Sequence, residues 1–139
     1  MADTRQNERE RTAYHEAGHA VAYLVAGRTF RYVTIRPRSA GITGQVYVRP
    51  RRIDSIQLAV IAHCGPIAEG RFLLANTTED EMEEGGMEPE DIIMSAYLEN
   101  GRGDLETVRY ALTNYGSCSD VVEEVASAIL DKQWGAVNA

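Results

Sequence analysis

The sequence predicts an α+β fold that is mainly helical, with an N-terminal helix, a small β-hairpin or sheet, and then a C-terminal helical bundle. Three observations lead to this prediction. Apolar residues recur at three- and four-residue spacing over residues 7–27, as on one face of a helix. Residues 30–37 and 44–50 alternate large and polar side chains, which is typical of strands. After residue 53 most of the chain returns to the helical pattern, so a single domain over residues 1–139 is expected.

Local signals set the limits of the first elements. Gly27 is a natural stop for the first helix, and Pro50 closes the second strand of the hairpin. Residues 53–74 have a helical pattern but contain Pro66, so two helices and one bent helix are both open. The apolar residues of the first helix are expected to face the core: Ala13, Ala17, Ala20, Val21, Leu24 and Val25.

An acidic segment over residues 76–90 follows. It has dense acid, a Gly-Gly pair and no periodicity, which predicts a mobile, solvated loop. Asp104 is expected to be an N-terminal helix cap. Three further helices are expected beyond the segment, at residues 91–99, 104–115 and 119–134. Three aromatic side chains are interpreted as packing residues: Tyr14, Tyr23 and Trp134.

Charge is divided unevenly along the chain. Ten of the 14 lysines and arginines lie in residues 1–52, whereas 17 of the 21 acidic residues lie beyond them. The net charge of -7 and the lack of interleaved aromatic residues argue against a nucleic-acid partner. No apolar run approaches the roughly 20 residues that cross a bilayer, and the N-terminus is too polar for a signal peptide, so a cytoplasmic protein without membrane contact is expected. Cys64 and Cys118 are expected to be reduced and receive no chemical role.

The stretch "HEAGH" carries the chemistry of this sequence. His15 and His19 are four residues apart, so on a helix they project from one face and can bind a single Zn²⁺. Glu16 is rotated by about 100 degrees, which makes it a poor ligand but a candidate general base for a water. Gly18 is unfavourable inside a helix and suggests that another group approaches the backbone closely there. This pattern predicts a metal site rather than an ordinary amphipathic helix.

Two histidines leave a zinc site incomplete, because a catalytic zinc normally has three protein ligands and one open position. The motif does not continue to a nearby third histidine, since Ala22 and Val25 occupy the relevant positions. The remaining candidates for the third ligand are His63, Glu69, Asp104 and the acidic segment. An acidic residue on a later helix is favoured.

These segments resemble the peptidase domain of the FtsH-type ATP-dependent zinc proteases across about residues 9–115. "TAYHEAGHAVAYLVAG" is similar to the HEAGH helix of that family, "YVTIRPR" with "GITGQVYV" to its strand pair, "AHCGPIAEGRF" to its glycine-containing helix, and "GRGDLETV" to its segment ending in Asn-Asp-Leu. The resemblance implies a zincin-like helix in which His15 and His19 bind zinc and Glu16 is the catalytic acid/base. It also implies Asp104 as third ligand and strand addition of substrate at the hairpin edge near residues 44–48.

Three departures separate this chain from the family pattern. These 139 residues contain no G-x-x-x-x-G-K-[ST] loop, so neither the ATPase domain nor the membrane anchor of the family is expected, and no unfolding or threading of a substrate is expected from this segment. Pro66 stands where the family usually has arginine, and Gly103 where it usually has asparagine. The acidic segment over residues 79–91 is extra.

The expected function is a zinc metalloendopeptidase that hydrolyses unfolded or flexible polypeptides without ATP. The alternative is a non-catalytic, zinc-stabilised protein-binding module derived from a protease domain, and a zinc hydrolase for a non-peptide amide or ester is a third option. A polypeptide substrate is the expected partner, and a separately encoded ATPase or self-association is left open.

Overall fold

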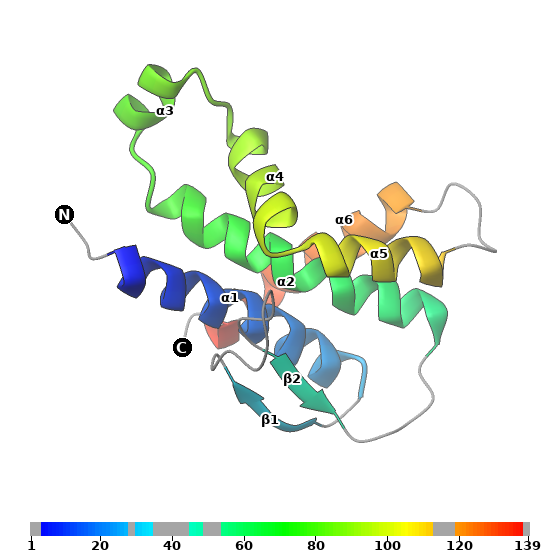
Figure 1. The fold of residues 1–139 in the computed structure, drawn as a ribbon. Coiled ribbons are helices and arrows are strands. Elements are labelled where there is room, and N and C mark those ends of the chain that lie inside the picture. Colours follow the sequence, from blue (N-terminus) through cyan, green and yellow to red (C-terminus); the bar gives the residue numbers. More distant parts are fainter. Residues whose placement is uncertain (1–3, 28–29, 35–44, 49–53, 113–118, 138–139) are drawn as a thin grey trace.

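A computed structural model describes residues 4–27, 30–34, 45–48, 54–112 and 119–137. The described part of the chain contains six helices and two strands (Figure 1): α1 (Thr4–Val25), β1 (Phe30–Thr34), β2 (Gln45–Val48), α2 (Ser55–Ala75), α3 (Glu79–Gly85), α4 (Pro89–Glu99), α5 (Arg102–Ala111) and α6 (Ser119–Val137).

Helix α2 is the central element of the fold. Helices α1, α4, α5 and α6 all pack against it, and every residue from Ala59 to Gly70 is buried. Asp54 caps its N-terminus by accepting hydrogen bonds from the backbone N–H groups of Ile56 and Gln57. Burial on all sides explains why this helix is mostly apolar all round rather than along one face. Among the described residues it is the one helix long and apolar enough to cross a membrane, but most of it lies inside the domain.

Pro66 lies within α2, yet the helix continues to Ala75. A proline inside a helix has no N–H to donate and costs about 3 kcal/mol. Its side chain is fully buried against the turn between α4 and α5, where a Cβ added to Gly101 would come within 2.8 Å of the proline Cγ. The choice left open by the sequence is therefore resolved as one helix, and the proline ring is a packing surface for the α4–α5 turn.

Helix α1 forms where the sequence predicts a helix, but its buried face differs from the expectation. Leu24 and Val25 are 56% and 48% exposed, and Ala13 is exposed too, although all three were expected to face the core. The side chains that α1 buries include Thr12, His15 and Glu16. The polar motif, rather than the largest apolar residues of the helix, is therefore turned toward the interior.

Aromatic packing joins α1, α2 and α6. Tyr14 stacks on Phe72 with ring centroids 4.5 Å apart and lies 6.1 Å from the ring of Trp134. The guanidinium of Arg71 lies 5.6 Å from the centroid of the same tryptophan ring. Tyr23 is partly buried against the core. The predicted packing roles of the three aromatic residues are confirmed.

The two strands form one antiparallel pair beside α1 (Figure 1). Tyr32 pairs with Tyr47 and Thr34 with Gln45, and the register is interrupted by a bulge between Phe30 and Tyr32. Residues 38–43, which connect the two predicted strands, lie outside the described residues, as do the ends of both predicted strands at 35–37, 44 and 49–50, and Cys118.

The predicted α+β class is wrong, because the described chain is almost entirely helical. Within the described residues, the strands contain five and four residues and pair only with each other. A two-stranded ribbon of this size cannot form a layer of the fold. The later helices do not form a separate C-terminal bundle either, since α4, α5 and α6 pack on the same helix as α1. The strand pattern was correctly read locally, but it was wrongly taken to indicate a sheet that helps to define the fold class.

The predicted loop over residues 76–90 is also corrected, because helix α3 occupies its middle. Thr78 and Glu81 form a capping box at the start of this helix, and Gly86 ends it in the left-handed conformation with φ 63°. None of its residues is buried, and it stands away from the other helices in Figure 1. The segment is solvated as expected, but it has a regular structure.

Candidate metal centre

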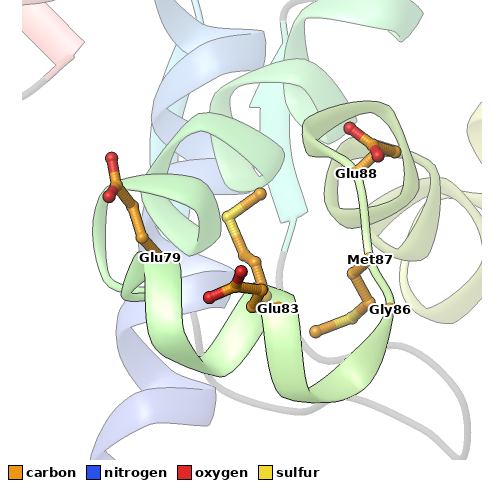
Figure 2. Close-up of a pocket in the computed structure, with 6 residues that line it drawn as sticks. Glu79, Glu83, Gly86, Met87 and Glu88 are labelled. Atoms are coloured by element: carbon orange, nitrogen blue, oxygen red, sulfur yellow. The ribbon is translucent and has the colours of Figure 1, made fainter.

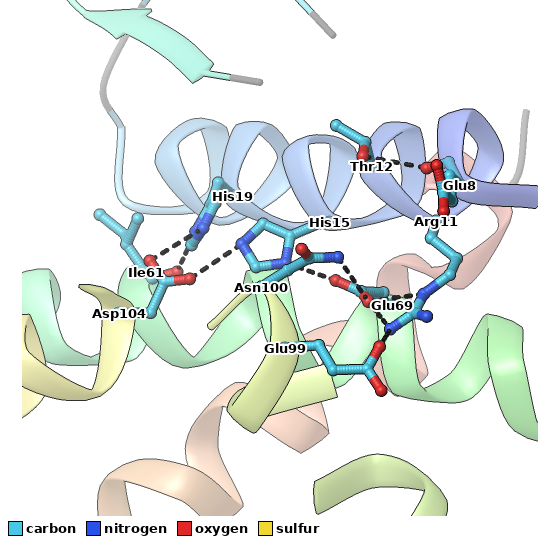
Figure 3. A network of polar contacts seen from close by, with 10 residues as sticks. All are labelled: Glu8, Arg11, Thr12, His15, His19, Ile61, Glu69, Glu99, Asn100 and Asp104. Carbon is cyan, nitrogen blue, oxygen red and sulfur yellow. Dashed lines mark hydrogen bonds and ion pairs between the residues drawn. The ribbon is translucent and has the colours of Figure 1, made fainter. Parts of the chain in front are cut away.

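Three side chains from two helices converge at one point (Figure 3). His15 and His19 come from α1, and Asp104 comes from the first turn of α5. The Nε2 atom of His15 lies 2.8 Å from Oδ2 of Asp104, and Nε2 of His19 lies 3.2 Å from Oδ1 of the same carboxylate. One donor atom from each residue lies within 4.8 Å of the other two. The structure thus brings together the three residues that the sequence analysis named as ligands.

Two glycines allow α1 and α2 to approach closely enough for this arrangement. A Cβ on Gly18 would lie 2.3 Å from the backbone oxygen of Cys64, which confirms the close approach expected from a glycine between the histidines. A Cβ on Gly65 would lie 2.3 Å from Nε2 of His19. Because real Cβ atoms do not make such contacts, both positions require glycine in this packing. The second glycine gives the imidazole of His19 its space.

The other ring nitrogen of each histidine is also held. Nδ1 of His19 lies 2.7 Å from the backbone oxygen of Ile61, which can only accept a hydrogen bond, so this nitrogen donates. Nδ1 of His15 lies 2.9 Å from Oε1 of Glu69 and donates to that carboxylate. In the neutral ring a proton on Nδ1 leaves a lone pair on Nε2, which is the atom directed toward Asp104 in both cases.

The charges at the centre are strongly coupled. Burial alone would lower the pKa of His15, but hydrogen bonds to Asp104 and Glu69 raise that pKa to about 9. Burial alone would raise the pKa of Asp104, but the charge of His19 and the hydrogen bonds from both histidines hold it well below its ordinary value. The two pKa shifts both favour a protonated His15 beside an ionised Asp104.

Glu16 lies next to this cluster and has no comparable anchor. It is 7% exposed and makes no hydrogen bond to another described residue. Burial raises the pKa of its carboxyl, and the nearby His19 and His15 lower it in part. A buried carboxylate with a raised pKa and no fixed partner is suited to accepting a proton.

The donor set fits a zinc ion. Two imidazole nitrogens and one carboxylate oxygen form a common ligand combination for catalytic Zn²⁺. Adjacent ligand atoms of a tetrahedral site with bonds of 2.0–2.1 Å lie about 3.3 Å apart. The contacts from the two carboxylate oxygens of Asp104 to the histidines, at 2.8 and 3.2 Å, are near that spacing, and one ligand atom from each residue lies within 4.8 Å of the other two. Outer hydrogen-bond partners on both imidazoles are a further property of metal-binding histidines.

The other residues considered as third ligand lie elsewhere or do something else. Glu69 contacts the outer nitrogen of His15, so it is a partner of a candidate ligand. His63 is buried with its Nδ1 atom 2.7 Å from the hydroxyl of Tyr97. Helix α3 occupies the middle of the acidic segment, and none of its residues belongs to the group of three candidate ligands. The predicted cap at Asp104 is wrong, because α5 begins at Arg102 with Gly101 as its N-cap, and the carboxylate of Asp104 points to the histidines instead.

A hollow of about 380 Å³ lies beside α3 and the start of α4 (Figure 2). Three glutamates, two methionines and one glycine line it: Glu79, Glu83, Glu88, Met82, Met87 and Gly86. It contains none of the candidate ligands and is not part of the metal centre.

Sequence reasoning missed the polar network that extends from the centre along α1 (Figure 3). Arg11 donates two hydrogen bonds to Oε2 of Glu69, from Nε at 3.0 Å and Nη2 at 2.7 Å. Asn100 donates a third to the same oxygen at 3.1 Å, and Arg11 also pairs with Glu99 at 2.7 Å. The available signal was the position of Arg11, one helical turn before His15 on the same face.

In comparisons with known proteins, no protein-family model, no curated protein sequence and no solved structure matches this chain. The geometry of the centre is therefore the basis for assigning a function.

Proposed function

We propose that this protein is a zinc-dependent metalloendopeptidase, akin to the FtsH-type peptidase domain, that hydrolyses peptide bonds in unfolded or flexible polypeptides. The observation that carries the proposal is the convergence of His15, His19 and Asp104 on one point, although the aspartate follows the second histidine by 85 positions. A helix alone explains the two histidines. The third donor arrives only through the packing of α5 on α2.

Each residue has a distinct role in this proposal. His15, His19 and Asp104 would hold the ion through Nε2, Nε2 and a carboxylate oxygen. When bound there, Zn²⁺ would supply Lewis acidity and lower the pKa of a water toward 7. Glu16 would accept a proton from the attacking water on its carboxylate and deliver it to the leaving amine nitrogen. Its burial favours this role, since the raised pKa brings the carboxylate closer to the pH at which it must take up and release a proton.

The strand pair beside α1 supports a polypeptide as the substrate class. Within the described residues, β1 and β2 pair only with each other, so each strand has one edge that no described strand covers. An extended peptide can add to such an edge through backbone hydrogen bonds, which do not depend on its sequence. Both strands contact α1, the helix that carries His15 and His19.

The test is hydrolysis of a flexible protein such as casein by the zinc-loaded chain. Glu16→Gln should reduce kcat about 10²–10⁴-fold while the zinc content stays at one ion per chain. Glu106→Gln is the matched control, because it neutralises an exposed carboxylate on α5, the helix of Asp104. Cleavage by Glu16→Gln at the wild-type rate would disprove the proposal. Zinc binding without turnover of casein or of a broad peptide library would make the zinc-stabilised binding module the better description.

A further inference from the structure

The side chain of Arg11 lies at the junction of three elements. It extends from α1 one turn before His15, and it contacts Glu69 on α2 and Glu99 at the end of α4. Its side chain is 18% exposed, and that of Glu69 is fully buried. This contact is therefore a charge-assisted pair at the edge of the core, which differs from a solvated surface ion pair.

The two carboxylate oxygens of Glu69 have different partners. Three N–H groups, two from Arg11 and one from Asn100, donate to Oε2. Only Oε1 remains for Nδ1 of His15, at 2.9 Å. Because three donors contact Oε2, the plane of the carboxylate is fixed, and Oε1 is held next to the imidazole of His15. The orientation of the His15 ring thus depends on groups that do not touch it.

The same network reaches the third candidate ligand through the backbone. Glu99 ends α4, Asn100 is its C-cap and Gly101 is the N-cap of α5. Asp104 follows in the first turn of α5. Arg11 therefore ties the turn that precedes Asp104 to the helix that carries both histidines.

We propose that Arg11 is a positioning residue of the metal centre, which holds Glu69 in the orientation that His15 needs and docks the α4–α5 turn so that Asp104 reaches both histidines. This inference rests on the proposed function, since it takes these residues to be the metal ligands. It goes beyond that function because it assigns a role to a residue outside the ligand set. A simple stabilising role would affect folding but leave the ligand geometry unchanged in folded protein.

The first measurement is the Kd for Zn²⁺, obtained by competition with a chromogenic chelator. Arg11→Met keeps most of the side-chain volume and removes the guanidinium, and it should raise the Kd about 10–100-fold, as loss of an outer partner of a metal ligand does. Arg11→Lys keeps the positive charge but cannot donate the two hydrogen bonds that the guanidinium makes, so its Kd should lie between those of the wild type and Arg11→Met. Arg71→Met is the control, because Arg71 is a similarly part-buried arginine that pairs with the exposed Asp131 on α6 and contacts none of the candidate ligands. Its Kd should equal that of wild type.

The second measurement is the visible absorption spectrum of the Co²⁺-loaded proteins, which reports ligand geometry at the ion. Arg11→Met should shift or weaken the bands relative to wild type, whereas Arg71→Met should not. Glu99→Gln provides a milder variant, since this carboxylate is 56% exposed and its loss leaves the contact between Arg11 and Glu69 in place. It should raise the Kd for Zn²⁺ less than Arg11→Met does. Circular dichroism establishes that each variant is folded.

A folded Arg11→Met protein with wild-type zinc affinity and cobalt spectrum would overturn the positioning role. An equal loss of affinity in Arg71→Met would overturn it too, because the effect would then be general destabilisation. If Arg11→Met does not fold, Arg11→Lys and Glu99→Gln provide the test. A wild-type Kd for Zn²⁺ in both of these variants would contradict the positioning role. Tight zinc binding without peptide cleavage would defeat the proposed function and leave the positioning role intact, whereas a wild-type chain that binds no zinc would defeat both.

Discussion

Nε2 of His15 lies 2.8 Å from Oδ2 of Asp104, and the two residues are 89 positions apart in the chain. The contact joins α1, which carries the HEAGH motif, to α5, and both of these helices pack on the buried α2. A carboxylate placed this close to two imidazoles completes a three-donor set that neither helix could provide alone.

Removal of that carboxylate should abolish tight zinc binding. We expect Asp104→Ala to raise the Kd for Zn²⁺ by more than about 100-fold, because loss of a ligand costs more than the 10–100-fold effect of losing an outer partner. Isothermal titration with Zn²⁺ measures the change. Asp131→Asn, which neutralises an exposed carboxylate on α6, is the control and should bind like wild type. Equal zinc affinities for the wild type and Asp104→Ala would show that Asp104 is not a ligand.

A methyl group at position 65 should disturb both the fold and the centre. The Cβ of Gly65→Ala would lie 2.3 Å from Nε2 of His19, so the imidazole or the helix must move. We expect a loss of about 1–3 kcal/mol in the free energy of unfolding, typical of overpacking, together with weaker zinc binding. Urea denaturation and zinc titration measure the two effects.

The comparison for that variant is Gly103→Ala in α5, where a Cβ would meet no atom within 4 Å. This substitution should be neutral or should stabilise the protein by up to about 1 kcal/mol, because alanine favours helix over glycine. If Gly65→Ala behaved in the same way, the close packing of His19 against α2 would be contradicted.

A buried histidine outside the centre leads to an independent stability prediction. His63 is 3% exposed, its Nδ1 contacts the hydroxyl of Tyr97, and its Nε2 has no hydrogen-bond partner in the described structure. An unpaired buried polar atom costs about 1–3 kcal/mol. Replacing both partners with apolar groups, in His63→Leu with Tyr97→Phe, removes that cost and should leave the free energy of unfolding unchanged or higher.

The single variants of this pair should behave differently from the double variant. His63→Leu leaves the tyrosine hydroxyl unpaired, and Tyr97→Phe leaves both histidine nitrogens unpaired. We therefore expect Tyr97→Phe to be the least stable of the three in urea denaturation. A double variant that is less stable than Tyr97→Phe would show that Nε2 of His63 has a favourable partner.

The local part of the centre was predictable from the sequence, because helix geometry alone puts His15 and His19 on one face. The close packing at Gly18 was also predictable, because glycine is unfavourable inside a helix and its presence there suggests that another group lies close to the backbone. Asp104 is different. Its sequence context suggests a helix cap, and only the packing of α5 on α2 turns its carboxylate to the histidines. The family resemblance, rather than any local pattern, pointed to it.

The network around Glu69 could not be predicted, because its contacts join residues that are far apart in the chain. Arg11 and Glu69 are separated by 58 positions, and Asn100 and Glu69 by 31. The mistaken fold class has the opposite cause. Short alternating segments are a real strand signal, but their pattern does not tell whether further strands extend the sheet. Helix α3 was missed although its capping box, Thr78 and Glu81, is visible in the sequence.

The coupled charges at the centre predict how stability and metal affinity depend on pH. In the metal-free protein the pKa of His15 is raised from 6.5 to about 9, so its ion pair stabilises the fold fully below about pH 6.5 and loses this effect as the pH rises through 9. The pKa of Asp104 is lowered from 3.8, so its contribution is present above that pH and is lost in stronger acid. The metal-free protein should therefore lose up to about 3 kcal/mol of stability between pH 6.5 and 9.5.

Zinc binding should have the opposite pH dependence over the same range. The ion needs the lone pair on Nε2 of His15, so binding must release the proton that is hydrogen-bonded to Asp104 there. Zinc affinity should increase as the pH rises toward 9, and the rise in Tm on adding Zn²⁺ should increase with it. Thermal unfolding at several pH values, with chelator or with Zn²⁺, measures both trends. In His15→Gln, the metal-free Tm and the rise in Tm on adding Zn²⁺ should both depend less on pH. The ion pair would be contradicted if the metal-free Tm rose from pH 6.5 to 9 in the wild type but not in this variant.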